Sequence, residues 1–279
     1  MKGTVTIATG ILLIARMISV FLAPIPDCDE TFNFWEPTHY LSHSFGERTW
    51  EYDPTFALRS FLFLLPLSCV SSVLYAVFQI PRVYIFFILR SVIALLIFQC
   101  DRLLSSESAF SLLLFAVLPG PSIQASPSYL PTTLAMALQS FSLYLLSRSK
   151  RKYDFLACFL VGFGCVASGW PFAGAAFVPH GILSCYSNGV FSTAFVTVAG
   201  VSIALLLSYL VDGFYFGKDF AIPSANIVIY NVLSSDRGPD LYVCVYYYVH
   251  SKILIPLQSN QVRCGILAFL FLKSFREFQ

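Results

Sequence analysis

The chain has 279 residues, of which 57% are apolar and only 11% are charged. A soluble domain has about 25% charged residues, so this chain has too little charge to cover a water-soluble globule of its size. Its formal net charge of +2 is too balanced to indicate nucleic acid as a partner. The apolar residues form long runs and do not alternate, which excludes an outer-membrane barrel and predicts an all-α polytopic membrane protein.

Residues 4–23 form the first apolar run, which is long enough to cross the hydrocarbon layer. The run is longer than the apolar core of a cleaved signal peptide, so we expect a retained anchor. Segment 108–127 is predicted to be re-entrant or interfacial, because its apolar part is short and Pro119-Gly120-Pro121 interrupts it. Further spans are expected at 55–77, 83–99, 128–147, 153–169, 171–187 and 190–211.

The densest basic run, Arg148-Ser149-Lys150-Arg151-Lys152, predicts which side of the membrane is cytosolic. The positive-inside rule places such a run in the cytosol. With a cytosolic N-terminus, four connecting segments then share the non-cytosolic side. These are the loops 24–54, 119–127 and 212–242 and the turn at 168–171.

Loop 24–54 differs from the rest of the chain in its polarity. It contains seven of the 15 acidic residues, two of the three Trp and two of the four His. One interpretation is a solvated loop that caps a helix, with Asp29 or Thr31 as the N-cap. The other is a catalytic loop, in which one carboxylate acts as general base on an incoming hydroxyl group.

The sequence of this loop carries a family resemblance. Residues 27–41 read DCDETFNFWEPTHYL and are followed by Thr49-Trp50-Glu51-Tyr52. This resembles the first luminal loop of the dolichyl-phosphate-mannose-dependent α-mannosyltransferases, glycosyltransferase family 22, and most closely the α-1,2 branch of asparagine-linked glycosylation. Later segments resemble the family in the same order, at 126–131, 169–172, 212–218, 226–232 and 238–242.

The resemblance implies a GT-C-type helical bundle with a luminal catalytic loop, in a multi-pass protein of the endoplasmic reticulum membrane. It implies inverting transfer of mannose from dolichyl-phosphate-mannose to the dolichyl-pyrophosphate-linked oligosaccharide, in α-1,2 linkage. Asp29 matches the general base, and Glu30 would orient the acceptor or the base. No tightly bound cofactor is implied, and no metal is assigned. The alternatives are a glycosylphosphatidylinositol-precursor mannosyltransferase of the same family, a truncated non-catalytic isoform and, ranked last, a transporter.

Several further residues are candidates for substrate binding, each with a structural alternative. Arg59 would either contact the donor phosphate or extend to the interface, and Arg90 would form a structural ion pair or contact a lipid phosphate. His39 and His43 are four residues apart, but no third zinc ligand is evident. Aromatic residues would stack on sugars or form an interfacial belt. The full set of substrate-binding candidates is Asp27, Trp35, Glu36, His39, Arg59, Arg90, Trp170 and Lys218.

Asp212 is a further candidate for contact with the acceptor, while Arg16, within the first apolar run, has no evident role. The motif resemblance stops after Tyr242. We therefore expect residues 1–242 to form an incomplete mannosyltransferase transmembrane domain and residues 243–279 to form a divergent C-terminal tail. The chain is interpreted as a C-terminally truncated form.

Overall fold

The computed structural model describes residues 2–25, 27–104, 124–148, 150–217 and 221–233. These residues form helices and connecting loops and no strand, which confirms the all-α class. The chain divides into two compact units, 1–228 and 229–279. The described part of the second unit is a short π-helix, Ile229–Leu233. Everything below concerns the first unit.

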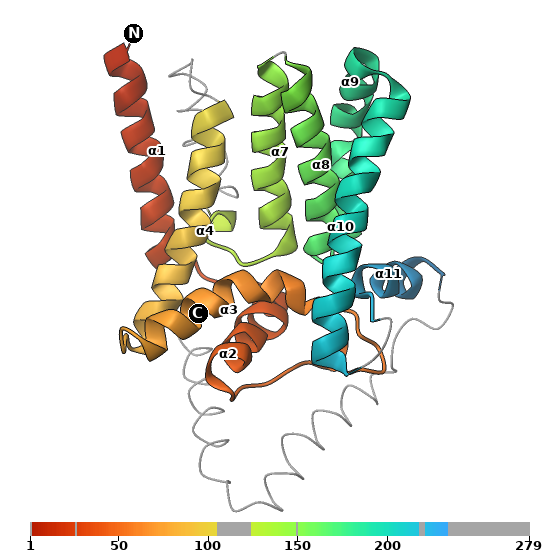
Figure 1. Cartoon of the computed structure of the whole chain (residues 1–279). Coiled ribbons are helices and arrows are strands. Elements are labelled where there is room, and N and C mark those ends of the chain that lie inside the picture. The colour runs from red at the N-terminus through yellow and green to blue at the C-terminus, as the bar shows by residue number, and fades with distance from the viewer. Residues whose placement is uncertain (1, 26, 105–123, 149, 218–220, 234–279) are drawn as a thin grey trace, which may run out of the picture. The chain divides into compact units, whose positions relative to one another are not determined.

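The body of the first unit is a bundle of helices that run side by side (Figure 1). Three of them, over Thr4–Leu22, Arg82–Leu104 and Val190–Phe216, are long and apolar enough to cross a membrane. Their presence confirms the prediction of a multi-pass membrane protein. The bundle consists of α1 (Lys2–Leu22), α4 (Arg82–Leu104), α7 (Pro131–Ser147), α8 (Arg151–Ala167), α9 (Val178–Asn188) and α10 (Val190–Phe216).

The two ends of this bundle carry different segments. The start of α1 and the connection between α7 and α8 lie at one end (Figure 1). The loop after α1, the start of α7 and the end of α10 lie at the opposite end, which we call the loop end. The basic run at 148–152 and the acidic loop at 24–54 therefore lie at opposite ends, as predicted. Which end is cytosolic stays a prediction.

The expectation of a membrane span at 55–77 is wrong. The α-helix there, α3 (Phe61–Ala76), has only 16 residues and lies across the loop end, from α10 to α4 (Figure 1). Residues 53–58 form turns, and Ser60 caps the helix by accepting a hydrogen bond from the Leu62 N–H group. An apolar run of this length does not distinguish a span from a helix buried against other protein. Because α3 does not cross the bundle, α4 begins at the loop end and runs toward the end where α1 starts (Figure 1).

The expectation of a single span at 171–187 is also wrong. The segment begins with a 3₁₀-helix, η3 (Pro171–Phe177), and continues as α9, which has 11 residues. Pro179 lies in the first turn of α9, where proline is tolerated because its missing N–H group would have no partner inside the helix. The expected re-entrant segment 108–127 lies mostly outside the described residues, since 105–123 are not described.

Helices α8 and α10 approach each other closely through two glycines. A Cβ atom on Gly162 would overlap the backbone oxygen of Thr197, and one on Gly200 would overlap that of Phe159. Membrane helices lack a hydrophobic driving force for association, so contact through small residues of this kind stabilises the pair.

Short helices complete the loop end. They are η1 (Glu30–Trp35), α2 (Glu36–His43), η2 (Trp50–Tyr52) and α11 (Pro223–Val228). Phe34 of η1 and Tyr52 of η2 pack with Phe61 of α3, Phe216 of α10 and Tyr129 in one apolar cluster. This cluster fixes the polar loop as a folded layer on the bundle.

Candidate functional site

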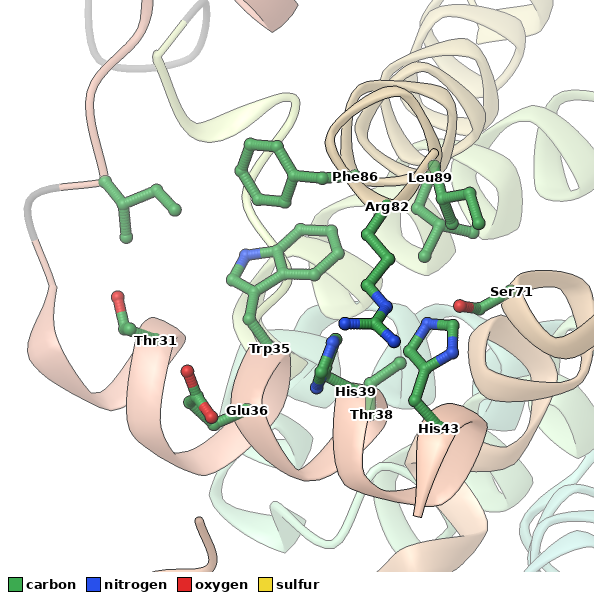
Figure 2. Close-up of a pocket in the computed structure, with 12 residues that line it drawn as sticks. Thr31, Trp35, Glu36, Thr38, His39, His43, Ser71, Arg82, Phe86 and Leu89 are labelled. Carbon is green, nitrogen blue, oxygen red and sulfur yellow. The ribbon is translucent and has the colours of Figure 1, made fainter. Parts of the chain in front are cut away.

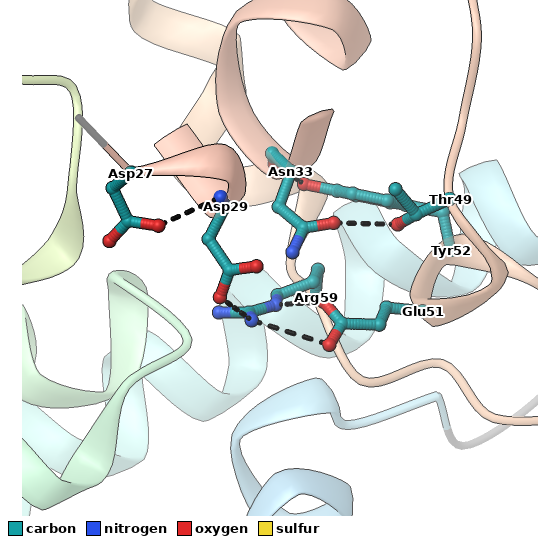
Figure 3. A network of polar contacts seen from close by, with 7 residues as sticks. All are labelled: Asp27, Asp29, Asn33, Thr49, Glu51, Tyr52 and Arg59. Atoms are coloured by element: carbon teal, nitrogen blue, oxygen red, sulfur yellow. Dashed lines mark hydrogen bonds and ion pairs between the residues drawn. The ribbon is translucent and has the colours of Figure 1, made fainter. Parts of the chain in front are cut away.

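Asp29 is the N-cap residue of η1, has helical backbone angles and is exposed. The backbone N–H group of Asp29 donates to the Asp27 carboxylate at 2.8 Å, which fixes the turn. Its own carboxylate accepts a hydrogen bond from Arg59 Nη2 at 3.2 Å, and its side chain is still 53% exposed (Figure 3). Asp29 is therefore both oriented and accessible.

Arg59 is the centre of the polar network drawn in Figure 3. Its Nε donates to Glu51 Oε2 at 2.5 Å, and its side chain is only 10% exposed. The guanidinium also lies over the rings of Phe34 and Trp170. Burial by itself would lower the pKa of Arg59, but the hydrogen bond and charge of Glu51, with the charge of Asp29, raise it above its ordinary value. Arg59 is thus a permanent cation that is enclosed by its partners.

Two segments distant in the sequence position Arg59. The Asn226 side chain of α11 donates to the backbone oxygens of Phe56 and Ala57, at 3.4 and 3.1 Å. Asp212 of α10 accepts from the Ser60 hydroxyl at 2.8 Å and from the Phe61 N–H group at 2.6 Å. Asp212 is fully buried, so it holds the start of α3 and is not placed to contact an acceptor as predicted.

Trp170 reaches the network through a tight turn after α8. Gly169 has φ +68°, a conformation that favours glycine, and a Cβ atom there would approach the Ser60 side chain. The turn therefore lies directly against the start of α3. This contact explains why the sequence Gly169-Trp170-Pro171 places an indole beside Arg59.

Glu30, the neighbour of Asp29, is buried. Only 1% of it is exposed, and its Oε1 accepts hydrogen bonds from Trp35 Nε1 and from the Tyr129 N–H group, both at 2.9 Å. Its Oε2 is buried without a hydrogen-bond partner among the described residues. Glu30 therefore ties η1 to the segment before α7 and is not open to a substrate as Asp29 is.

A second set of hydrogen bonds closes the loop on itself. The Thr49 hydroxyl donates to Asn33 Oδ1 at 2.6 Å, and the Tyr52 hydroxyl donates to the Asn33 backbone oxygen at 2.6 Å (Figure 3). Burial raises the pKa of Tyr52 well above its ordinary value, so Tyr52 stays a neutral donor. These bonds hold η2, and therefore Glu51, against η1.

The remaining candidates do not join this network. Trp35, Glu36 and His39 line a pocket on another side of α2 (Figure 2). Arg90 is buried within α4, where its Nη2 donates to the backbone oxygen of Ala23 at 2.8 Å. Lys218 lies outside the described residues.

One cluster of potential metal ligands is present among the described residues. Asp27, Cys28 and Asp29 are all exposed, and their ligand atoms lie within 4.8 Å of one another. His39 and His43 gain no third His, Cys, Asp or Glu ligand in the described part of the chain. The sequence assigned no metal, and metal dependence stays untested.

Comparison with known proteins identifies the family. Residues 7–274 match the model of the Alg9-like mannosyltransferase family. The chain belongs to this family. The match extends beyond residue 242, where the motif resemblance stops, and the boundary between domain and tail stays a prediction.

Three relatives illustrate the similarity, and each is named α-1,2-mannosyltransferase ALG9. The mouse protein is 31% identical over 86% of this chain and 40% of its own length. The Schizosaccharomyces pombe protein is 33% identical over 94% of this chain and 48% of its own length. The Saccharomyces cerevisiae protein is 29% identical over 96% of this chain and 52% of its own length. The chain thus spans about half the length of the curated relatives it matches. No solved structure is significantly similar to it.

The network contains residues that were not predicted to belong to a site. Glu51 and Asn226 lie in segments that resemble the family, but only the structure shows that Glu51 accepts from Arg59 and that Asn226 donates to the backbone just before it. A signal for Glu51 was present, because it lies in the acidic loop next to Trp50. No signal in the sequence pairs Asn226 with the turn at Phe56.

Proposed function

We propose that this chain is the part of an α-1,2-mannosyltransferase that takes mannose from dolichyl-phosphate-mannose. The acceptor is the dolichyl-pyrophosphate-linked oligosaccharide of asparagine-linked glycosylation, and the loop end faces the lumen of the endoplasmic reticulum. Membership in the Alg9-like mannosyltransferase family supports the reaction class. The observation that carries the assignment of the site is an exposed Asp29 carboxylate, oriented by an enclosed arginine, beside a buried Glu30.

In the proposed reaction an acceptor hydroxyl oxygen attacks C1 of the mannose while the bond between C1 and the phosphate oxygen breaks. The electron pair of that bond leaves with dolichyl phosphate, and Asp29 takes the hydroxyl proton. Attack opposite the leaving group converts the β-linked donor into an α-linked product. Phosphate is already a fair leaving group, so the protein needs chiefly to position the acceptor and to stabilise developing charge.

Arg59 has two roles in this proposal. Its Nη2 holds the Asp29 carboxylate in one orientation at 3.2 Å. Its charge also lies beside the reacting region and attracts the phosphate as negative charge develops there. The two bonds to Glu51 support this arrangement, because they keep the guanidinium in place while the substrate changes.

The experiment is mannose transfer by the chain reconstituted in liposomes, with radiolabelled dolichyl-phosphate-mannose and the lipid-linked acceptor. Replacing Asp29 by Asn removes the proton acceptor and keeps the size of the side chain. A general base contributes about 10²–10⁴-fold, so Asp29→Asn is expected to lose at least a hundredfold in rate. Asp27→Asn is the comparison variant, because its amide oxygen can still accept the hydrogen bond from the Asp29 N–H group, and it is expected to lose much less transfer than Asp29→Asn.

Three results would contradict the proposal or a part of it. Equal losses in Asp27→Asn and Asp29→Asn would place the effect in the turn and not in a base. No transfer by the well-inserted unsubstituted chain would mean that this product does not catalyse the reaction by itself. Transfer to a glycosylphosphatidylinositol precursor and not to the lipid-linked oligosaccharide would change the acceptor within the same family.

A further inference from the structure

Arg90 is a charged residue within α4 that the proposed reaction does not use. It is only 4% exposed, although α4 is one of the helices that are long and apolar enough to cross a membrane. A charge at such a position is costly unless another group compensates it, and its partner points to its role. The groups around Arg90 therefore indicate what its charge does.

The first contact of Arg90 holds the end of α1. Its Nη2 donates to the backbone oxygen of Ala23 at 2.8 Å. Ala23 follows the last residue of α1, Leu22, and its own N–H group donates to the backbone oxygen of Ser19 at 2.9 Å. The last carbonyl groups of a helix lack partners within the helix and carry partial negative charge, so a cation stabilises them. Arg90 thus fixes the point at which the chain leaves α1 for the loop that carries Asp29.

Two aromatic rings in contact link Arg90 to the buried carboxylate of Glu30. The guanidinium lies over the Phe86 ring, with Cζ 5.4 Å from the ring centroid. The Phe86 ring packs edge-on against Trp35, with their centroids 4.9 Å apart (Figure 2). The Trp35 Nε1 atom in turn donates to Glu30 Oε1 at 2.9 Å. A continuous set of contacts therefore runs from the cation on α4 to the acid in η1.

Arg90 and Glu30 each have an unused polar atom. Arg90 Nε and Glu30 Oε2 are buried and have no hydrogen-bond partner in the part of the chain that the structure describes. Among the described residues, Glu30 is the charged group whose field acts on Arg90. Opposite charges in a low-dielectric interior attract each other across several ångströms without direct contact. Arg90 therefore compensates a carboxylate that is only 1% exposed.

Arg59 does not supply this compensation. Its guanidinium donates to Glu51 at 2.5 Å and to Asp29 at 3.2 Å. The two adjacent acids of the loop thus depend on different arginines, Asp29 on Arg59 at the loop end and Glu30 on Arg90 within the bundle.

We propose that Arg90 is a positioning residue for Asp29. It holds the end of α1 at Ala23 and compensates the charge of Glu30, and so it fixes both sides of the segment that leads to Asp29. Arg90 touches no reacting atom in this proposal, because its guanidinium is enclosed and its Nη2 is bonded to the backbone. The role of Asp29 rests on the proposed function, whereas the order of its segment is measurable without any transfer.

The test is hydrogen exchange, measured by mass spectrometry on the full chain in nanodiscs of phosphatidylcholine. Arg90→Met removes the cation and keeps an apolar side chain in the bundle. Residues 27–35 are expected to exchange at least about tenfold faster in this variant, because a buried carboxylate without an opposite charge is strongly destabilising. Arg102→Met, at the other end of the same helix, is the matched control and is expected to exchange as the unsubstituted chain does.

Two further variants separate charge from packing. Arg90→Lys keeps a cation, so residues 27–35 are expected to exchange more slowly in it than in Arg90→Met. Adding Glu30→Gln to Arg90→Met removes the uncompensated charge and keeps an acceptor for Trp35 and Tyr129. This double variant is expected to recover most of the protection, since residues that interact give non-additive effects in a double-mutant cycle.

The role of Arg90 is overturned by any of three results. An equal rise in exchange over α10, whose main contacts are with α8, α9 and α3, would mean that Arg90 stabilises the bundle as a whole. A double variant that exchanges as fast as Arg90→Met would mean that the charge of Glu30 needs no compensation. Equal exchange in Arg90→Met and Arg102→Met would mean that Arg90 does not order the segment.

Mannose transfer by the same variants separates this proposal from the catalytic one. A misplaced base slows the chemical step more than it weakens substrate binding, so Arg90→Met is expected to lose at least about tenfold in kcat with little change in KM. Faster exchange at 27–35 that Glu30→Gln reverses, in a chain that transfers no mannose, would support the role of Arg90 and contradict the proposed function. Transfer that depends on Asp29 and is as fast in Arg90→Met as in the unsubstituted chain would do the reverse.

Discussion

Two arginine–aspartate pairs in this protein have opposite surroundings. Within the bundle, Arg16 of α1 donates to Asp101 of α4 at 2.8 Å, and their side chains are 1% and 7% exposed. At the loop end, Arg59 donates to Asp29 at 3.2 Å, and their side chains are 10% and 53% exposed. The first aspartate is enclosed by protein, and the second has one face open to a ligand.

The difference separates a structural pair from the pair that we propose to act in the reaction. A charge within a membrane span is costly unless a partner compensates it, and Ser140 of α7 adds a further hydrogen bond to Asp101 at 3.1 Å. The cluster therefore joins three helices and explains the arginine within the first apolar run. An exposed pair contributes little to stability, so the pair of Arg59 and Asp29 does not serve the fold as the buried pair does.

The largest effect is expected in the enclosed pair. Asp101→Ala removes the carboxylate that Arg16 faces inside the bundle. Breaking a buried pair by removing one partner costs about 3–5 kcal/mol, so the free energy of unfolding should fall by about that amount. Reversible unfolding of the chain in mixed detergent micelles measures the change.

The double variant Arg16→Met with Asp101→Leu is the control, because it removes both charges and keeps the apolar volume. It is expected to recover most of the stability that Asp101→Ala loses, since apolar replacement of a buried pair is often neutral. A double variant as unstable as Asp101→Ala would show that packing, and not charge, holds these helices together.

The next effect concerns Glu30, which resembles Asp101 in its burial although it is adjacent to Asp29. Glu30→Ala leaves the Trp35 and Tyr129 N–H donors without their acceptor, and each such loss costs about 1–3 kcal/mol. Glu30→Gln keeps an acceptor oxygen and is expected to restore most of this stability. Unfolding measurements on both variants test this, and equal stability of the two would contradict the structural role of Glu30.

The contrast between these carboxylates marks what the sequence could and could not predict. Long apolar runs predicted the helices of the bundle, and the concentration of acids predicted which loop carries a candidate site. Adjacent residues such as Asp29 and Glu30 are equivalent in sequence, and only tertiary packing buries one and exposes the other.

The errors have a common physical cause. Residues 55–77 are as apolar as a span, yet α3 lies across the loop end because its partners there are protein and not lipid. Asp212 and Asn226 hold the backbone around Arg59 across more than 150 residues of sequence. Spacing along a chain carries no information about such contacts, whereas periodicity and composition describe local structure well.

A smaller effect on stability is expected at the open pair. Asp29→Asn removes an ion pair whose carboxylate is exposed, and such pairs contribute about 0–1 kcal/mol. The free energy of unfolding should therefore change by less than about 1 kcal/mol, while mannose transfer falls at least about a hundredfold. A stability loss comparable to that of Asp101→Ala would remove the distinction between the two pairs.

The smallest effect is expected from His43 and appears as a dependence of stability on pH. Burial lowers the pKa of His43, as do the charges of His39 on α2 and Arg82 on α4; from α3, the Tyr75 ring packs against it. A histidine whose folded pKa lies below its unfolded value of about 6.5 favours the folded state above that pH. This contribution is lost as the pH falls below about 6.5, because the unfolded chain then binds the proton more readily. The loss of melting temperature between pH 7.5 and 5.5 should therefore be smaller in His43→Gln than in the unsubstituted chain. An equal loss in both would mean that the surroundings of His43 do not disfavour a charged imidazole. Solvent would then screen the charge of Arg82 from His43.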